Sequence, residues 1–338
     1  RDSVRALARR REEPAAELAA QIAAAHSPEE RRTVLNRFKD TQIFRIDVEH
    51  IVARKADFSF LSRHLSDLAE LVVTTALDIV LPEMEAVYGT PRTVAGLPAR
   101  YAVFGLGKLG GRALGYASDI ELLFVYGDNG ATDGRQSVTN AEFFERFFSE
   151  VVACIESKRE GIFQVDVRLR PHGIAGPLAV SLESFCRHYA RDGEAHSYEK
   201  LALTRLRFIA GDADLGERVG RLRDDLIYAT DTIDLAELRE LRRRQLDEKH
   251  IRGRLNAKFS PGGLVDLEYS LQILMIQHGR GDPALRTPSL HASLEGLTRA
   301  GVLERDEADR LVKAYRFLRN LINGLRMLRG NAKDLYLP

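Results

Sequence analysis

Residues 1–98 repeat their apolar positions with the period of an α-helix. Alanine-rich, charged sequence from Ser3 to Ala25 predicts a first helix, and Ser27-Pro28 followed by two glutamates marks the start of a second. A longer stretch, from Leu61 to Tyr88, has the strongest periodicity. We therefore expect an N-terminal helical region. The apolar residues that define the period of the long stretch are Leu65, Leu68, Leu71, Val72, Leu77 and Ile79.

The pattern changes between residues 99 and 180, where strands are expected. Alternating or continuous apolar runs predict strands at 101–106, 119–126 and 162–170. A helix is expected at about 139–157. Its aromatic residues indicate packing against the sheet rather than a platform on which bases stack. These aromatic residues are Phe143, Phe144, Phe147 and Phe148.

Residues 181–338 return to helical periodicity, with Gly, Pro and Asp turns between the segments. The sequence therefore predicts an α+β fold in three parts. These are an N-terminal helical region (1–98), a core made of a small mixed sheet with helices (99–180), and a C-terminal helical bundle (181–338). Helices of the bundle are expected near 182–191, 213–228, 234–250, 263–278, 289–300 and 305–329.

Two acidic residues open the second predicted strand. Successive side chains of a strand point to opposite faces, so Asp119 and Glu121 share one face. Two neighbouring carboxylates repel each other unless a positive charge lies between them. Mg²⁺ is the usual neutraliser, because it binds one or two carboxylates together with the phosphates of a substrate. The opposite face of the strand is apolar and carries Ile120, Leu122 and Phe124.

A glycine-rich turn, GLGKLGG at 105–111, precedes this strand. At Gly107-Lys108, backbone N–H groups and an ammonium group are available to hold phosphates. Gly110 and Gly111 allow the backbone to pass close to a ligand without a Cβ clash. A phosphate-binding turn ten residues before a metal-binding strand is typical of a nucleotidyl-transfer site. Further candidates for phosphate contact are Arg112, Ser118, Arg168 and Arg170.

The same glycines spell GxGxxG, the fingerprint of dinucleotide-binding folds. That fingerprint requires a helix of several turns before the next strand. Asp119 follows Gly110 by only nine residues, and Gly115 and Ser118 interrupt any helix there. The spacing therefore argues against a nicotinamide-binding fold.

The third predicted strand, FQVDVRLRP, alternates strictly between apolar and polar positions. If it pairs beside 119–126 with the polar faces aligned, Asp166 joins the two other carboxylates. Three carboxylates would then surround one or two metal ions, an arrangement that promotes phosphoryl displacement. A carboxylate placed in this way can also accept the proton of an incoming hydroxyl. The alternative is an exposed face on which Asp166 pairs with Arg168 or Arg170.

The composition is that of an ordinary globular protein, with 44% hydrophobic and 29% charged residues among 338. A net charge of +1 gives no overall attraction to nucleic acid or to an anionic membrane. Neither a signal peptide nor a membrane span is expected, and two cysteines without ligand-like spacing favour a reduced, cytoplasmic setting. Because the chain starts with Arg rather than Met, we expect it to be a piece of a longer protein.

These motifs resemble the glutamine synthetase adenylyltransferases, which are bifunctional enzymes of the DNA polymerase β-like nucleotidyltransferase superfamily. GLGKLGG is followed by SDIEL and then by VDVRLRP, as in that family. The superfamily pattern is a Gly-Ser pair, a short spacer, and Asp-x-Asp or Asp-x-Glu; Gly107-Lys108 holds the place of the pair here. The resemblance extends over nearly the whole chain, through LNRFKDTQIFRIDVEHI (35–51), YEKLALTRLRFIAGD (198–212) and KFSPGGLVDLEY (258–269).

The resemblance implies a catalytic unit that uses Mg²⁺, as two ions, and ATP. In the family, one unit attaches AMP to a tyrosine of glutamine synthetase and a second unit removes it by phosphorolysis, under the control of a PII signalling protein and glutamine. The implied metal ligands are Asp119, Glu121 and Asp166. The family usually has Asp where this chain has Glu121.

Three functions stay open at this point. Gly115-Tyr116 and GGLVDLEY favour the AMP-attaching unit, whereas GPLAVS and the final segment NAKDLYLP favour the AMP-removing unit. Glu121 is the one feature that favours an inactive regulatory domain that binds only a nucleotide or a partner. For an active unit, we expect the acceptor protein to dock across the helices of 181–338, with Arg242 and Arg243 in contact with it.

Overall fold

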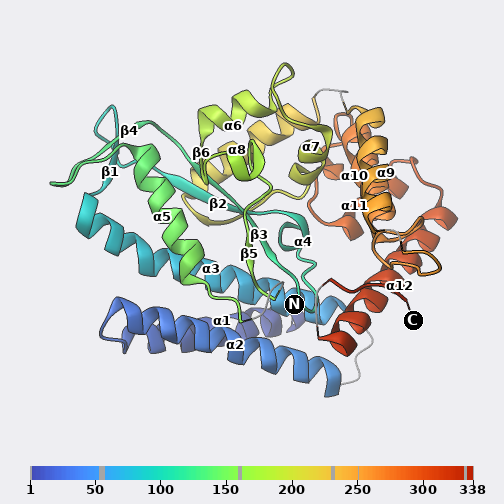
Figure 1. The fold of residues 1–338 in the computed structure, drawn as a ribbon, viewed down its shortest axis with the longest axis horizontal. Helices are drawn as coiled ribbons and strands as arrows, with labels where there is room; N and C mark the ends of the chain where they lie inside the picture. Colours follow the sequence, from blue (N-terminus) through green and yellow to red (C-terminus); the bar gives the residue numbers. More distant parts are fainter. Residues whose placement is uncertain are drawn as a thin grey trace.

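The expected α+β class is confirmed by a computed structural model, in which a small sheet lies between N-terminal and C-terminal helices (Figure 1). Within the described ranges, no helix combines the length and the apolar character needed to cross a membrane. Side chains are described from residue 13 onward. The described residues are 2–52, 58–158, 162–229, 233–249, 251–330 and 333–337.

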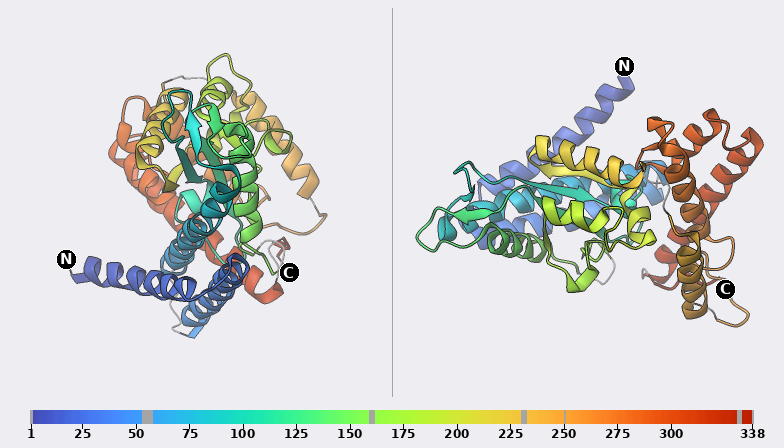
Figure 2. Two further views of the ribbon diagram at one scale, coloured as in Figure 1. Left: turned by 90° about the vertical axis from the view of Figure 1, so that its left-hand side faces the viewer. Right: turned by 90° about the horizontal axis from the view of Figure 1, so that it is seen from above.

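Three long helices form the N-terminal region, as predicted. They lie along one side of the sheet (Figures 1 and 2), where α2 packs on α3 and α3 packs on a later helix, α5. The periodic apolar residues of the longest helix face this packing: Leu65, Leu68, Val72, Leu77 and Ile79 are buried, and Leu71 is partly buried. The three helices are α1 (Asp2–Ala23), α2 (Pro28–Val52) and α3 (Phe58–Tyr88).

The main sheet is mixed, with the strand order β5-β3-β2-β7 and with β6 paired to the far end of β3. β2 is antiparallel to both β3 and β7, whereas β5 and β6 run parallel to β3. The antiparallel β2–β3 pair confirms that no dinucleotide-binding crossover is present here. The strands are β2 (Tyr101–Gly105), β3 (Ile120–Tyr126), β5 (Val165–Asp166), β6 (Ala179–Ser181) and β7 (Arg207–Gly211); β1 (Pro91–Thr93) and β4 (Gly130–Thr132) form a separate antiparallel pair.

The third predicted strand is much shorter than its alternating sequence suggests. Only Val165–Asp166 pairs with β3. Phe163 has a positive φ of 55°, and the Asp166 carboxylate accepts the backbone N–H of Arg168, so the chain turns on both sides of the pair. The prediction of a strand over 162–170 is therefore wrong in extent, although its pairing with β3 is confirmed.

Helices dominate the rest of the chain, close to the predicted ranges. The elements that were not predicted are the short strands β1, β4 and β6, the helical turn α4, the helix α7, and β7, which extends the sheet from a part of the chain expected to be helical. His250, expected at the end of a helix, lies outside the described residues. The division into parts at residues 98 and 180 stays a prediction. The helices are α4 (Gly107–Gly110), α5 (Asn140–Cys154), α6 (Leu182–Tyr189), α7 (Ser197–Leu203), α8 (Ala213–Ile227), α9 (Leu235–Lys249), α10 (Leu264–Gly279), α11 (Leu290–Arg299) and α12 (Arg305–Arg329), with 3₁₀ turns at Gly173–Ala175 and Pro283–Leu285.

The two faces of the sheet belong to two hydrophobic cores. Leu122 and Phe124 pack in the core shared with α2, α3 and α5, whereas Leu123 and Val125 pack in the core shared with the C-terminal helices. The predicted phenylalanine cluster of α5 is fully buried, and the ring of Phe148 stacks on Phe124 with 4.3 Å between centroids. Its interpretation as core packing is therefore confirmed.

Replacing Phe148 by alanine tests this packing. Loss of a buried phenylalanine side chain typically costs about 3–5 kcal/mol of unfolding free energy. We expect Phe148→Ala to lower the unfolding free energy in urea titrations by this amount. Phe317→Ala serves as the control, because residue Phe317 is 65% exposed, and we expect a change within about 0.5 kcal/mol. Equal losses in the two variants would contradict the core assignment.

Candidate active site

The glycine turn and the acidic strand are joined by a direct hydrogen bond. The chain leaves β2, bends at Gly107 with a φ of +50°, and forms the single helical turn α4. The backbone N–H of Lys108 donates to Oε2 of Glu121 at 3.0 Å. A Cβ on residue 107 would lie 1.6 Å from this oxygen. Glycine is therefore required at 107 so that the turn can close on the Glu121 carboxylate.

The three predicted carboxylates come from adjacent positions on neighbouring strands. Glu121 is the register partner of Asp166 in the parallel β3–β5 pair, and Asp119 directly precedes β3. Burial, followed by repulsion from the Asp166 carboxylate, raises the pKa of Asp119. Oδ1 of Asp119 is buried and accepts no hydrogen bond from any described residue. The site thus contains a buried oxygen that needs a positive partner.

Asp166 takes part in both of the arrangements that the sequence allowed. It lies beside Glu121, and it also binds Arg168, whose Nη2 is 2.6 Å from Oδ2. Burial alone would raise the pKa of the Asp166 carboxyl, but the hydrogen bonds from Arg168 outweigh this effect and lower the pKa. The Arg168 side chain is 68% exposed, so it lies at the solvent edge of the site.

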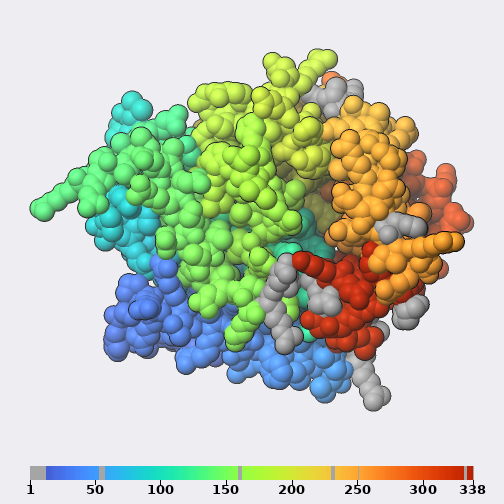
Figure 3. Space-filling model, viewed as in Figure 1, coloured from blue at the N-terminus to red at the C-terminus, as the bar shows by residue number. Residues whose placement is uncertain are grey.

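Cations from the C-terminal helices surround the carboxylates, and the sequence analysis missed them. The charge of Asp119 acts on Arg326 of α12 and on Lys258, which precedes α10. Nη1 of Arg326 donates to the carbonyl of Tyr116 at 3.0 Å, and Arg319 donates to the carbonyl of Ala113. Both arginines therefore hold the segment that leads into Asp119. In Figure 3 the orange and red C-terminal parts face the green part across a hollow.

These cations change the electrostatic environment of Lys108. Burial, followed by the guanidinium groups of Arg326 and Arg319, lowers the pKa of Lys108 well below its usual range. Nζ of Lys108 lies 3.5 Å from Oγ of Ser118, which is buried and accepts the backbone N–H of Gly115 at 3.0 Å. An excess of positive charge beside Lys108 makes this region suited to an anion such as a triphosphate.

A buried ion pair supports the turn from beneath. Nη2 of Arg205 lies 3.2 Å from Oε1 of Glu268, and both side chains are buried or nearly so. Burial alone would raise the pKa of Glu268, but attraction to Arg205 lowers it. The carbonyl of Arg205 would lie 1.9 Å from a Cβ on Gly110. Gly110 therefore makes room for the protein backbone at this point.

Two arginines that were expected to contact phosphates have other partners. Arg112 forms ion pairs with Asp67 and with Glu70, at 3.0 Å for the latter, on helix α3. Arg170 is buried and donates to backbone carbonyls, including that of Val167 at 2.6 Å and that of Gly176. The structure thus gives Arg112 and Arg170 supporting contacts with the protein itself. Gly111 lies against the carbonyl of Pro288, which would be 3.0 Å from an added Cβ.

The expected docking role of Arg242 is not supported by its surroundings. Its Nε lies 2.5 Å from Oδ1 of Asp266, and Nη2 donates to the carbonyl of Phe259 at 2.6 Å. Arg242 therefore ties α9 to the first turn of α10 and to the loop before it. Arg243 is exposed and pairs with Glu240 and Asp247 on its own helix.

The carboxylates fit a hard divalent cation. Among the described residues, no group of three or more His, Cys, Asp or Glu side chains is placed to hold a metal ion, so Asp119, Glu121 and Asp166 do not converge on one metal position as the sequence analysis expected. Mg²⁺ does not require such a group, because it keeps several waters and takes one or two carboxylates together with substrate phosphates. The unpartnered Oδ1 of Asp119 and the neighbouring Glu121 carboxylate supply hard oxygen ligands of this kind.

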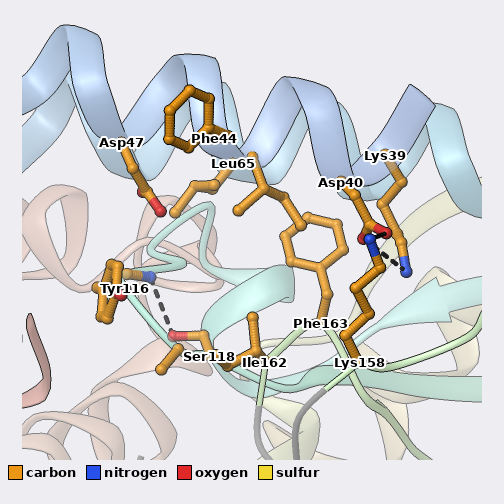
Figure 4. Close-up of a pocket in the computed structure, with 13 residues that line it drawn as sticks. Lys39, Asp40, Phe44, Asp47, Leu65, Tyr116, Ser118, Lys158, Ile162 and Phe163 are labelled. Carbon is orange, nitrogen blue, oxygen red and sulfur yellow. Dashed lines mark hydrogen bonds and ion pairs between the residues drawn. The ribbon is translucent and has the colours of Figure 1, made fainter. Parts of the chain in front are cut away.

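A cavity of about 310 Å³ lies behind the segment that leads into Asp119 (Figure 4). Helix α2 forms its roof, and Gly115–Ser118 and Phe163 form its floor. The Asp47 side chain points from α2 toward Tyr116. Burial raises the pKa of Asp47 to about 6.

Residues 4–222 match the family model of glutamate-ammonia ligase adenylyltransferase, and residues 234–336 match that of GlnD PII-uridylyltransferase. Curated relatives named bifunctional glutamine synthetase adenylyltransferase/adenylyl-removing enzyme include one from Methylococcus capsulatus, 33% identical over 318 residues. Those from Shewanella oneidensis and Bradyrhizobium diazoefficiens are each 32% identical, over 323 and 324 residues.

These alignments cover most of the chain and a smaller part of each relative. They include 93%, 93% and 94% of this chain, but 33%, 33% and 32% of the respective relatives. The chain thus spans about a third of the length of the curated relatives it matches.

Asp47 generates a prediction about the dependence of stability on pH. Its pKa is about 6 in the folded protein and near 3.8 when unfolded, so the folded state binds the proton more tightly. The contribution of protonated Asp47 to the unfolding free energy is therefore fully present below pH 4 and is lost as the pH rises through 6. We expect Asp47→Asn to raise the unfolding free energy at pH 7.5 by about 1–3 kcal/mol, with little effect at pH 4. Urea titrations at both pH values measure the difference, and an equal effect at pH 4 and pH 7.5 would contradict the assignment.

Proposed function

The chain belongs to the glutamate-ammonia ligase adenylyltransferase family, and from this premise we propose that it is one nucleotidyl-transfer unit. It moves AMP between ATP and a tyrosine hydroxyl of glutamine synthetase, in the cytoplasm, and so regulates nitrogen assimilation. The observation that carries the proposal is the hydrogen bond from the Gly107-Lys108 turn to Glu121, beside Asp119 and Asp166. It brings a phosphate-binding turn and a carboxylate cluster into one cleft.

Each part of the cleft has a task in this reaction. The N–H groups of the turn and Arg326 would attract the triphosphate, whose negative charge would in turn favour the protonated form of Lys108. Asp119, Glu121 and Asp166 would hold Mg²⁺, as one or two ions, which when bound offsets the charge that develops on the transferred phosphoryl group. Arg168, on the rim, would contact the phosphates or keep the Asp166 carboxylate in place.

The match of residues 234–336 to a second family suggests which part of the chain binds the nucleotide. The second matching family is named for modifying PII, whereas the first is named for glutamate-ammonia ligase. A region that recurs in enzymes with different acceptors is suited to the shared task of holding a nucleotide. Lys258, Glu268 and Arg326 of this region reach the cleft, which supports that role.

We favour attachment of AMP as the direction of the reaction, on the Gly115-Tyr116 and GGLVDLEY sequences. Removal of AMP by phosphorolysis is the second candidate, on the GPLAVS sequence, whose Ala179–Ser181 forms β6 beside β3. A PII signalling protein is the proposed regulator. An inactive regulatory domain is disfavoured, because Glu121 is engaged with the turn rather than displaced from the site.

One experiment separates these possibilities. The purified chain is incubated with unmodified glutamine synthetase, ATP and Mg²⁺, and in parallel with the adenylylated enzyme and inorganic phosphate. AMP on glutamine synthetase is followed by mass spectrometry. Gain of AMP in the first mixture supports the favoured direction, and loss in the second supports removal. No change in either mixture would contradict catalysis by this chain.

Asp119→Asn is expected to abolish the reaction in either direction. The neutral amide cannot balance the charge of Mg²⁺, and loss of this stabilisation costs about a thousandfold or more in rate. Asp128→Asn is the matched control, since Asp128 is exposed beyond the other end of β3. We expect wild-type turnover from the control and native circular dichroism from both variants. More than a tenth of wild-type turnover in Asp119→Asn would contradict the metal assignment.

A further inference from the structure

A second cavity, of about 400 Å³, lies behind the glycine turn and away from the carboxylates. Its walls come from the start of α3, the turn after α4, the start of α11 and the middle of α12. Asp119, Glu121 and Asp166 do not line it. Of the described residues that do, none is Asp or Glu, and the titratable ones are Arg112, Arg205, His291, Tyr315, Arg316 and Arg319.

The positive charge on one wall of this cavity is only partly neutralised, since the charge of Arg319 acts on Glu268 without forming an ion pair with it. Arg112 and Arg205 have carboxylate partners, as described above. Arg316 and Arg319 form no ion pair with any carboxylate of the described residues. Only 6% of Arg319 is exposed, and it donates one hydrogen bond, to the carbonyl of Ala113. The two arginines lie three residues apart on α12, so they face the same side of the helix.

Helix α11 contributes backbone donors to the same cavity. It is a ten-residue helix, and Ser289 caps it by accepting the N–H of Ala292. The N–H groups of Leu290 and His291, in the first turn, have no carbonyl within their own helix to bind. The positive end of the helix dipole adds to the attraction for a negative charge. A buried guanidinium, an exposed guanidinium and a helix start thus surround one space.

We infer that this cavity binds a phosphate group, either as inorganic phosphate or as the phosphate of a mononucleotide. Arginine forks and backbone N–H groups match the oxygens of a phosphate in number and direction. Among the described residues no carboxylate lines the cavity, which lowers the repulsion that would oppose a dianion, although Glu70, Glu268 and Glu295 pair with lining cations from outside it. Phe58 and Tyr315 also line the cavity, so their rings would contact an organic group attached to the phosphate.

The site is coupled to the candidate active site through Arg319. This residue holds the carbonyl of Ala113, in the segment that continues to Ser118 and Asp119. A phosphate bound in the cavity would compete for the same guanidinium. The site is distinct from the AMP-transfer cleft, so the inference does not depend on the proposed reaction.

Calorimetric titration of the full chain at low ionic strength tests the inference. One arm uses inorganic phosphate and the other uses AMP, each without Mg²⁺. Arg316→Gln removes one exposed cation from the cavity and should weaken binding at least fivefold. Arg310→Gln is the matched control, since Arg310 is an exposed arginine of the same helix that does not line the cavity. It should leave the affinity within twofold of wild type.

The two arms identify the source of the phosphate group. Binding in either arm that depends on Arg316 supports the inference, and the arm in which it occurs names the ligand. Unchanged affinity in Arg316→Gln would show that the anion binds elsewhere and would overturn it. Equal weakening in Arg316→Gln and Arg310→Gln would also overturn it, because it would reflect general surface charge only. Absence of binding in both arms would do the same.

Discussion

The cleft depends on the mutual neutralisation of charges that come from the middle and from the C-terminal part of the chain. The sheet supplies carboxylates at Asp119, Glu121 and Asp166, and the C-terminal helices supply Lys258 and Arg326. Burying either set alone would be costly, because a buried charge without a partner loses its hydration and gains nothing in return. The strands and the C-terminal helices must therefore come together to form the site. This is a physical reason for a cleft built from segments some two hundred residues apart along the sequence.

The pairing of the acidic strands could be predicted from the sequence because strand geometry is local. Alternation places every second residue on one face, and the apolar face of β3 left Asp119 and Glu121 no other register. The same reasoning failed for the strand expected at 162–170. The positive φ of Phe163 and the turn closed by Asp166 and Arg168 end the pairing after two residues. Neither feature changes the alternation of apolar and polar residues, so the sequence pattern could not reveal them.

The cations of the site could not be predicted from the sequence, because they come from distant parts of the chain. Lys258 and Glu268 lie within KFSPGGLVDLEY, a segment that resembles the family. The sequence therefore marked this segment as important, but it did not show that the segment would lie beside the carboxylates. Arg319 and Arg326 had no such signal, because their partners Ala113 and Tyr116 are about two hundred residues away. Gly110 marks a close approach, but only the structure shows that it is to the carbonyl of Arg205.

The central claim is that carboxylates and cations share one cleft for a nucleotide and a divalent metal ion. Equilibrium binding of a non-hydrolysable ATP analogue to the intact chain, with Mg²⁺ and with EDTA, tests it most directly. The account predicts that Mg²⁺ strengthens binding about tenfold or more, because it relieves repulsion between the carboxylates and the triphosphate. Affinity that is the same with Mg²⁺ and with EDTA would contradict it.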